Sequence, residues 1–180
     1  MSITKHNVTQ GTEEWHKLRE PLYTGSNAYK LLITKDKNYA KAGGQSWGGN
    51  FSTRRGHTLE HQAIKLYEAI KDTEVEQVGF VTNDKYPGCG YSPDGLVPDR
   101  TIEVKAFNDE RQKANAKELE MEIMAQVQFG QLICGVKLTD VLLYNPDADV
   151  KNIKDKLIIK TVKRNPAIHA NFIRRLNCEQ

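Results

Sequence analysis

The sequence predicts an α/β protein in which a mixed central β-sheet is flanked by helices. Amphipathic helical patterns alternate with short runs rich in β-branched residues, which is typical of strands between helices. The chain has 180 residues, of which 38% are hydrophobic, and this suits one domain with a substantial core. We therefore treat residues 1–180 as a single domain.

The N-terminal part is expected to contain two short helices. Thr12 has the position of an N-cap, and the first helix should run to about Arg19, because Pro21 stops it. Ser26 is expected to be the N-cap of a second helix that continues to about Leu32.

Residues 35–53 form a polar stretch that is too long for an ordinary connection. The stretch includes four glycines, Gly43, Gly44, Gly48 and Gly49. It is predicted to be a mobile loop that orders on a ligand.

The rest of the chain shows the alternation on which the fold class depends. The expected elements are a helix at Thr58–Ile70, strands at Val75–Thr82, Gly90–Val97 and Thr101–Phe107, a helix at Lys117–Cys134, and strands at Thr139–Tyr144 and Lys156–Lys163. Asn165 and Pro166 have the residue types that open a final helix, as N-cap and first helical residue.

The composition excludes several classes of protein. A net charge of +3 is compatible with nucleic-acid binding but does not argue for it. The N-terminus lacks the apolar run of a signal peptide, and no apolar stretch is long enough to span a bilayer. The odd, widely spaced cysteines Cys89, Cys134 and Cys178 are typical of reduced thiols rather than of a metal cluster. A cytoplasmic protein without a membrane partner is expected.

The strongest chemical signal is Ser92-Pro93-Asp94-Gly95 followed by Ile102-Glu103-Val104-Lys105. Side chains two residues apart in a strand share a face, so Glu103 and Lys105 should project together. A hairpin between the two segments would bring Asp94 close to Glu103. Clustered carboxylates repel, and hard oxygen ligands favour Mg²⁺ or Mn²⁺. A neighbouring lysine suits the activation of water or the stabilisation of a phosphoryl transition state.

Two further polar residues lie on apolar helical faces. Glu60 shares its face with Ile64 and Tyr67, where an unpaired carboxylate is costly and a metal would relieve the cost. A salt bridge at the rim of the core is the alternative. Gln126 lies among apolar residues with Gly130 one turn later, so it needs partners; a satisfied structural amide is the alternative.

Arg19 and Ser26 suggest an anion site, because a helix start offers unpaired N–H groups and an arginine beside it binds phosphate. Many helices start at serine, and Arg19 has the alternative of capping its own helix.

Four segments in this order resemble the lambda-exonuclease (YqaJ-type) viral recombination nucleases, a branch of the PD-(D/E)XK superfamily with a restriction-endonuclease-like core. The segments are Gly11–Arg19 with Thr24-Gly25-Ser26, Gly56–Glu60, Ser92–Gly95 with Glu103-Val104-Lys105, and Met124-Ala125-Gln126-Val127-Gln128. The resemblance covers residues 11–145, and residues 146–180 form a C-terminal extension without a matched motif.

The resemblance implies a role for each matched residue. Asp94, Glu103 and the backbone carbonyl of Val104 would ligate metal, and Glu60 would bind the metal or orient its water. Lys105 would position the attacking water, and Gln126 would support the site. A second group, Arg19, Ser26 and Ser92, would hold a 5′-phosphate.

The same resemblance implies a pair of Mg²⁺ ions, replaceable by Mn²⁺, and 5′→3′ digestion of double-stranded DNA in phage-type recombination. It also implies a single-strand annealing protein as partner and a homo-oligomer, with a trimer as the family's known form. A structure-specific or nicking endonuclease on the same fold remains an alternative. A catalytically silent DNA-binding or inhibitory module is a further alternative, against which the intact acid–acid–lysine set argues.

Overall fold

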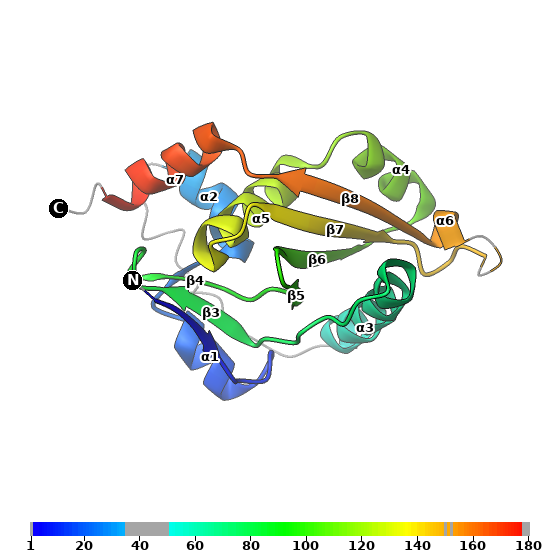
Figure 1. Cartoon of the computed structure of the whole chain (residues 1–180), viewed down its shortest axis with the longest axis horizontal. Coiled ribbons are helices and arrows are strands. Elements are labelled where there is room, and N and C mark those ends of the chain that lie inside the picture. Colours follow the sequence, from blue (N-terminus) through cyan, green and yellow to red (C-terminus); the bar gives the residue numbers. More distant parts are fainter. Residues whose placement is uncertain (1, 35–50, 150, 152, 178–180) are drawn as a thin grey trace.

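The structure is a computed structural model that describes residues 2–34, 51–149, 151 and 153–177. It confirms a mixed α/β fold, but with two four-stranded sheets in place of one (Figure 1). The first sheet contains, in spatial order, β1 (Ile3–His6), β3 (Phe80–Asn83), β4 (Cys89–Tyr91) and β2 (Tyr23–Thr24). The second contains β5 (Gly95–Val97), β6 (Arg100–Ala106), β7 (Leu138–Tyr144) and β8 (Leu157–Lys163). Each sheet includes one parallel pair, β2–β4 in the first and β6–β7 in the second.

The chain passes from the first sheet to the second at Ser92-Pro93-Asp94. The expected strand Gly90–Val97 is therefore wrong: it is divided into β4 and β5. The physical reason is Pro93, which has no N–H to donate and cannot occupy the middle of a hydrogen-bonded strand. Asp94 consequently lies where the two sheets meet.

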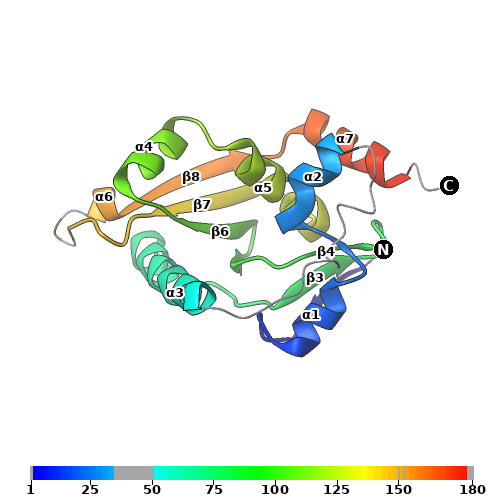
Figure 2. The ribbon, with the colours of Figure 1, turned by 180° about the vertical axis from the view of Figure 1, so that it is seen from behind.

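Helices cover both faces of the second sheet. On one face, α3 (Phe51–Lys71) packs through Ala63, Ile64 and Tyr67 against Ile102 and Leu142. On the other face lie α4 (Asp109–Lys117) and α5 (Met121–Cys134), and β6 lies between α3 and α5 in both views (Figures 1 and 2). This arrangement lets side chains from opposite layers reach the same end of β6.

The first sheet shares α5 with the second. Phe129 and Leu132 of α5 belong to a core cluster with Val81, Tyr91 and Phe172. The other helices around this cluster are α2 (Ala28–Ile33) and α7 (Pro166–Asn177). Shared packing on α5 thus ties the two sheets together.

Several predicted elements need correction. Helix α3 begins at Phe51, so residues 51–53 are helical and do not belong to a loop; residues 35–50 of the predicted mobile loop lie outside the described residues. The strand expected at Val75–Thr82 is shortened to β3, although Glu76 forms an isolated bridge with Leu96. The helix expected at Lys117–Cys134 begins only at Met121, and α4 precedes it as a separate helix.

The helix starts were predicted with mixed success. The Thr12 side chain caps α1 (Glu13–Arg19), and the Asn165 side chain accepts the Ala167 amide at 3.0 Å at the start of α7, both as expected. Ser26 is not an N-cap: it lies inside a 3₁₀ turn, η1 (Gly25–Asn27), and Asn27 has the N-cap position of α2. A short helix, α6 (Ile153–Lys156), precedes β8. Within the described residues, no helix is both long and apolar enough to cross a bilayer.

Candidate active site

The hairpin formed by β5 and β6 brings Asp94 close to the Glu103 strand, as the sequence predicts. Gly95 pairs with Ile102, and the amide of Asp94 donates to the Ile102 carbonyl at 3.2 Å. One carboxylate oxygen of Asp94 accepts the Val104 amide at 2.6 Å. The N–H and C=O of a strand residue face the same side, so the Val104 carbonyl also faces Asp94.

Glu103 is the centre of the cluster. Its Oε1 accepts hydrogen bonds from Lys105 Nζ at 2.7 Å and from Gln126 Nε2 at 2.5 Å. Lys105 Nζ also donates to Gln126 Oε1 at 3.1 Å, so the amide bridges both charged groups. The partners that the sequence requires for Gln126 are therefore Glu103 and Lys105. The glutamate side chain is 2% exposed and Lys105 is 24% exposed, so the lysine forms the solvent-facing side of the cluster.

Tyr91 is a member of the cluster that the sequence did not indicate. Its hydroxyl donates to Glu103 Oε2 at 2.5 Å, and the side chain is fully buried. Gly130 was expected to leave space beside Gln126, but the Tyr91 ring fills that space. A tyrosine in a short buried strand has no sequence signal that separates it from ordinary core.

Glu60 extends the cluster from α3. The carboxyl lies close enough to Glu103 and Lys105 for their charges to affect it. Burial first, and then the charge of Glu103, raise the pKa of Glu60 to about 7, whereas Lys105 opposes this. Glu60 therefore binds a proton more readily than an ordinary surface glutamate.

The same crowding affects the other titrating groups. Burial, followed by the charges of Glu103 and Glu60, raises the pKa of Asp94 well above its usual value. Burial alone would lower the pKa of Lys105, but Glu103 and Asp94 outweigh it and the pKa is raised. Buried acids that repel one another are stabilised by a bound proton or by a cation.

The donor set suits a hard cation, since it offers carboxylate oxygens and the Val104 carbonyl. Among the described residues, however, no three acidic, histidine or cysteine side chains already converge as a cage. The reason is visible in the hydrogen bonds: Glu103 is engaged by Lys105, Gln126 and Tyr91. A cation would have to use the acceptor position that these contacts leave on Glu103, or exchange with one of them.

A second polar group surrounds Arg19. Its guanidinium lies 3.8 Å from the centre of the Trp15 ring and donates to Ser26 Oγ at 3.0 Å. Trp15 Nε1 in turn donates to Ser92 Oγ at 2.9 Å, and Ser26 Oγ lies 3.2 Å from Thr24 Oγ1. The Trp15 indole thus contacts both Arg19 and Ser92, and Ser26 joins the group through Arg19, an arrangement that the sequence did not reveal.

Arg19 is a partly buried cation. Burial lowers the pKa of Arg19 to about 10, and its Nε is buried without a hydrogen-bond partner among the described residues. In that part of the chain no carboxylate forms an ion pair with it. The guanidinium donates to Ser26 rather than to the last carbonyls of α1, so its described contacts are not those of a helix cap.

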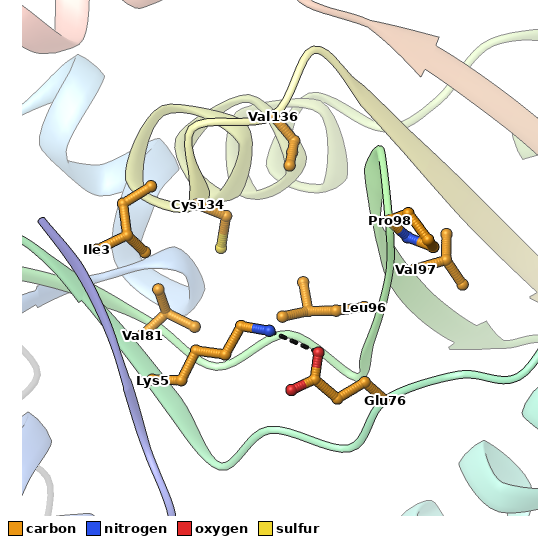
Figure 3. A pocket seen from close by; sticks show the side chains of 9 residues that line it. All are labelled: Ile3, Lys5, Glu76, Val81, Leu96, Val97, Pro98, Cys134 and Val136. Carbon is orange, nitrogen blue, oxygen red and sulfur yellow. Dashed lines mark hydrogen bonds and ion pairs between the residues drawn. The ribbon is translucent and has the colours of Figure 1, made fainter.

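One cavity borders the acidic cluster, and a second lies apart from both polar groups. One, of about 410 Å³, opens beside Lys105 and Gln126 and is also lined by Phe107, Arg111 and Glu120. The other, of about 300 Å³, lies near β1 and the end of α5, where Lys5 and Glu76 pair at 2.5 Å (Figure 3). Its lining includes none of the residues singled out from the sequence. The first cavity is the one that reaches the acidic cluster.

The hairpin, the acid–acid–lysine set and the helices on both faces define the PD-(D/E)XK-like nuclease fold. Residues 14–137 match the YqaJ-like viral recombinase domain, and the chain belongs to this family. No curated protein sequence matches the chain significantly.

Solved structures agree with the fold. The alkaline exonuclease LHK-Exo from Laribacter hongkongensis is 24% identical, with a TM-score of 0.76 over 93% of this chain and 90% of the other. Its complex with dAMP gives a TM-score of 0.77 at the same identity and coverage. A phage related exonuclease from Haemophilus somnus 129PT is 17% identical, with a TM-score of 0.61 over 89% of this chain and 92% of the other.

Proposed function

We propose that the protein is a Mg²⁺-dependent deoxyribonuclease that digests double-stranded DNA from 5′ ends in phage-type recombination. The observation that carries the proposal is the convergence of Asp94, Glu103 and Lys105, with Glu60 and Gln126, on one buried cluster. Family membership and the names of the similar structures support the same activity.

Each residue of the cluster has a distinct task in this proposal. Asp94, Glu103 and the Val104 carbonyl would hold the cations, and Glu60 would orient the attacking water. A pair of Mg²⁺ ions, replaceable by Mn²⁺, would supply charge stabilisation for the attacking and leaving oxygens.

Lys105 holds the water and stabilises charge at the phosphate, while Gln126 keeps the lysine in place. Water adds to phosphorus and the bond to the 3′-oxygen breaks, which leaves a 3′-hydroxyl and a 5′-phosphate. Successive cleavage from a 5′ end then releases 5′-mononucleotides.

The polar group around Arg19 would select the 5′ end. A terminal phosphate carries more charge than an internal diester, and a guanidinium forms charge-assisted hydrogen bonds with it. Arg19 and the hydroxyls of Ser26 and Ser92 are the proposed donors. A bound 5′ end would hold the next scissile bond at a fixed position over the acidic cluster. This position matters because a small misalignment lowers the reaction rate steeply.

The deciding experiment compares linear and covalently closed circular duplexes, with Mg²⁺ and with excess EDTA. We expect rapid loss of the linear duplex with Mg²⁺, an intact circle, and no reaction in EDTA. Nicking of the circle would support the endonuclease alternative. Binding without cleavage of either substrate would support the silent DNA-binding alternative.

The proposed 5′ anchor is tested with duplexes that differ only in a 5′-phosphate or 5′-hydroxyl. Wild type should degrade the phosphorylated duplex faster, and Arg19→Ala should largely erase this preference. Lys17→Ala is a matched control, because it removes one cation from the same helix, where Lys17 is 72% exposed and pairs with Glu13. Equal rates on both duplexes for wild type would disprove the anchor.

Assembly and partners are part of the proposal on family grounds alone. A homo-oligomer is proposed, with a trimer as the first expectation. Its molar mass is measured by light scattering as the protein elutes from a size-exclusion column. Association with a single-strand annealing protein is tested by co-purification with a purified phage-type annealing protein.

A further inference from the structure

We propose that Tyr91 is a positioning residue that fixes the Glu103 carboxylate for cation binding and sets its distance from the turn that carries Ser26. The inference rests on the proposed function, because it assumes that Glu103 binds a metal. It concerns a residue that contacts neither DNA nor the reacting atoms.

The Tyr91 hydroxyl is one of three donors to the Glu103 carboxylate among the described residues. A carboxylate offers about four acceptor positions, two on each oxygen. Lys105 and Gln126 use those on Oε1, and Tyr91 uses one on Oε2 at 2.5 Å. One position therefore remains, on Oε2, and the Tyr91 hydroxyl determines which way that oxygen points.

The Tyr91 ring is enclosed by two glycines from separate elements. A Cβ at Gly25 in η1 would lie 2.4 Å from ring atom Cε2, and a Cβ at Gly130 in α5 would lie 2.5 Å from Cζ. Both distances are too short for a real contact, so each glycine makes room for the ring. Tyr91 itself is 1% exposed and has no space to adopt another rotamer.

The ring therefore separates two groups that the proposed mechanism needs at a fixed spacing. On one edge it packs against η1, which carries Ser26 of the polar group around Arg19. At its hydroxyl it holds Glu103. An aromatic ring is rigid, so η1 and the Glu103 carboxylate are held at a fixed distance from each other.

The experiment measures Mn²⁺ binding by titration calorimetry without DNA, for wild type, Tyr91→Phe and Tyr67→Phe. Tyr67→Phe is the matched control: Tyr67 is 2% exposed, and its hydroxyl donates at 2.8 Å to the buried carboxylate of Asp140, which is not one of the proposed metal ligands. Each variant loses one buried hydroxyl and keeps its ring. Tyr91→Phe should bind Mn²⁺ about 10- to 100-fold more weakly, the usual effect of removing a partner that orients a metal ligand.

Tyr67→Phe should bind Mn²⁺ as wild type does, although it unfolds at a lower temperature. Because Tyr91→Phe keeps the ring, its preference for 5′-phosphorylated duplexes should be unchanged. Mn²⁺ binding by Tyr91→Phe that equals or exceeds that of wild type would overturn the inference while leaving the proposed function intact. A wild type that neither binds Mn²⁺ nor cleaves DNA would overturn both.

Gly25→Ala tests the spacing while keeping every polar side chain of the site. The added methyl must displace either the Tyr91 ring or η1. Displacement of the ring lowers Mn²⁺ affinity, and displacement of η1 lowers the preference for 5′-phosphate. A Gly25→Ala protein with both properties unchanged would refute the spacing role of the ring.

Discussion

Asp94 and Lys105 belong to one cluster but carry opposite charges, so their removal should have different consequences. Asp94→Ala and Lys105→Ala should each reduce turnover by about 10²-fold or more, the scale of losing one electrostatic stabiliser. Asp94→Ala should also weaken Mn²⁺ binding, whereas Lys105→Ala should not. Lys113→Ala is the control, because Lys113 pairs with Asp109 on the surface of α4. Wild-type turnover in either variant would remove that residue from the proposed site.

Glu60 should make the stability of the metal-free protein depend on pH. Its pKa is raised from 4.5 to about 7 by burial and Glu103, so the native state retains a proton that the unfolded chain has already released. The stabilisation is complete below about pH 4.5 and is lost as the pH rises through about 7. Thermal unfolding in EDTA should show this decline, and Glu60→Gln should show a smaller one. A steeper decline in Glu60→Gln would contradict the assignment.

Single residues differ in how far the sequence predicts them. Asp94, Glu103 and Lys105 follow from strand periodicity and a hairpin, which are local patterns. Tyr91 does not, because its contact with Glu103 depends on how β4 packs against α5. The group around Arg19 has the same limitation, since Trp15 joins Arg19 to Ser92, which lies 77 positions after Trp15 in the chain.

The C-terminus of helix α4 is capped by a lysine from a neighbouring strand, and the stability of the helix can be tested through it. Lys160 of β8 donates to the Asn115, Ala116 and Lys117 carbonyls at 3.2, 2.9 and 2.8 Å. A cation at a helix C-terminus satisfies exposed carbonyls and interacts favourably with the helix dipole. Lys160→Met keeps most of the side-chain packing and should cost about 1–2 kcal/mol. Urea denaturation should show the loss, with turnover unchanged; an unchanged midpoint would argue against the cap.

The same helix shows why some elements escape sequence analysis. The residues that α4 buries are Gln112 and Asn115, so it has no apolar face to produce helical periodicity. Gln112 instead donates to the Leu143 carbonyl at 2.8 Å. By contrast, β6, β7 and α7 carry clear apolar patterns or caps, and they were predicted to within one or two residues at their starts.

Cation binding should stabilise the whole molecule, because the site joins both sheets and α3. A ligand that binds only the folded state adds about 2.7 kcal/mol at a concentration of 100 times its Kd. Mg²⁺ or Mn²⁺ should therefore raise the unfolding temperature of wild type and should have little effect on Asp94→Ala. An equal shift in both proteins would show that the ions act elsewhere on the chain.

The class of the fold was predictable, but its division into two sheets was not. The local patterns predict most strands, whereas strand partners depend on tertiary packing. The sequence predicts one continuous strand at Gly90–Val97, whereas Pro93 prevents that strand from continuing.

The turn between β5 and β6 also restricts where residues can be inserted into the chain or deleted from it. Val97 pairs with Arg100, so only Pro98 and Asp99 connect the two strands. A one-residue insertion or deletion that shifted this register would turn Glu103 and Lys105 towards the face now occupied by Ile102 and Val104. Naturally occurring length variants of this protein should therefore tolerate indels at surface connections but not within this turn.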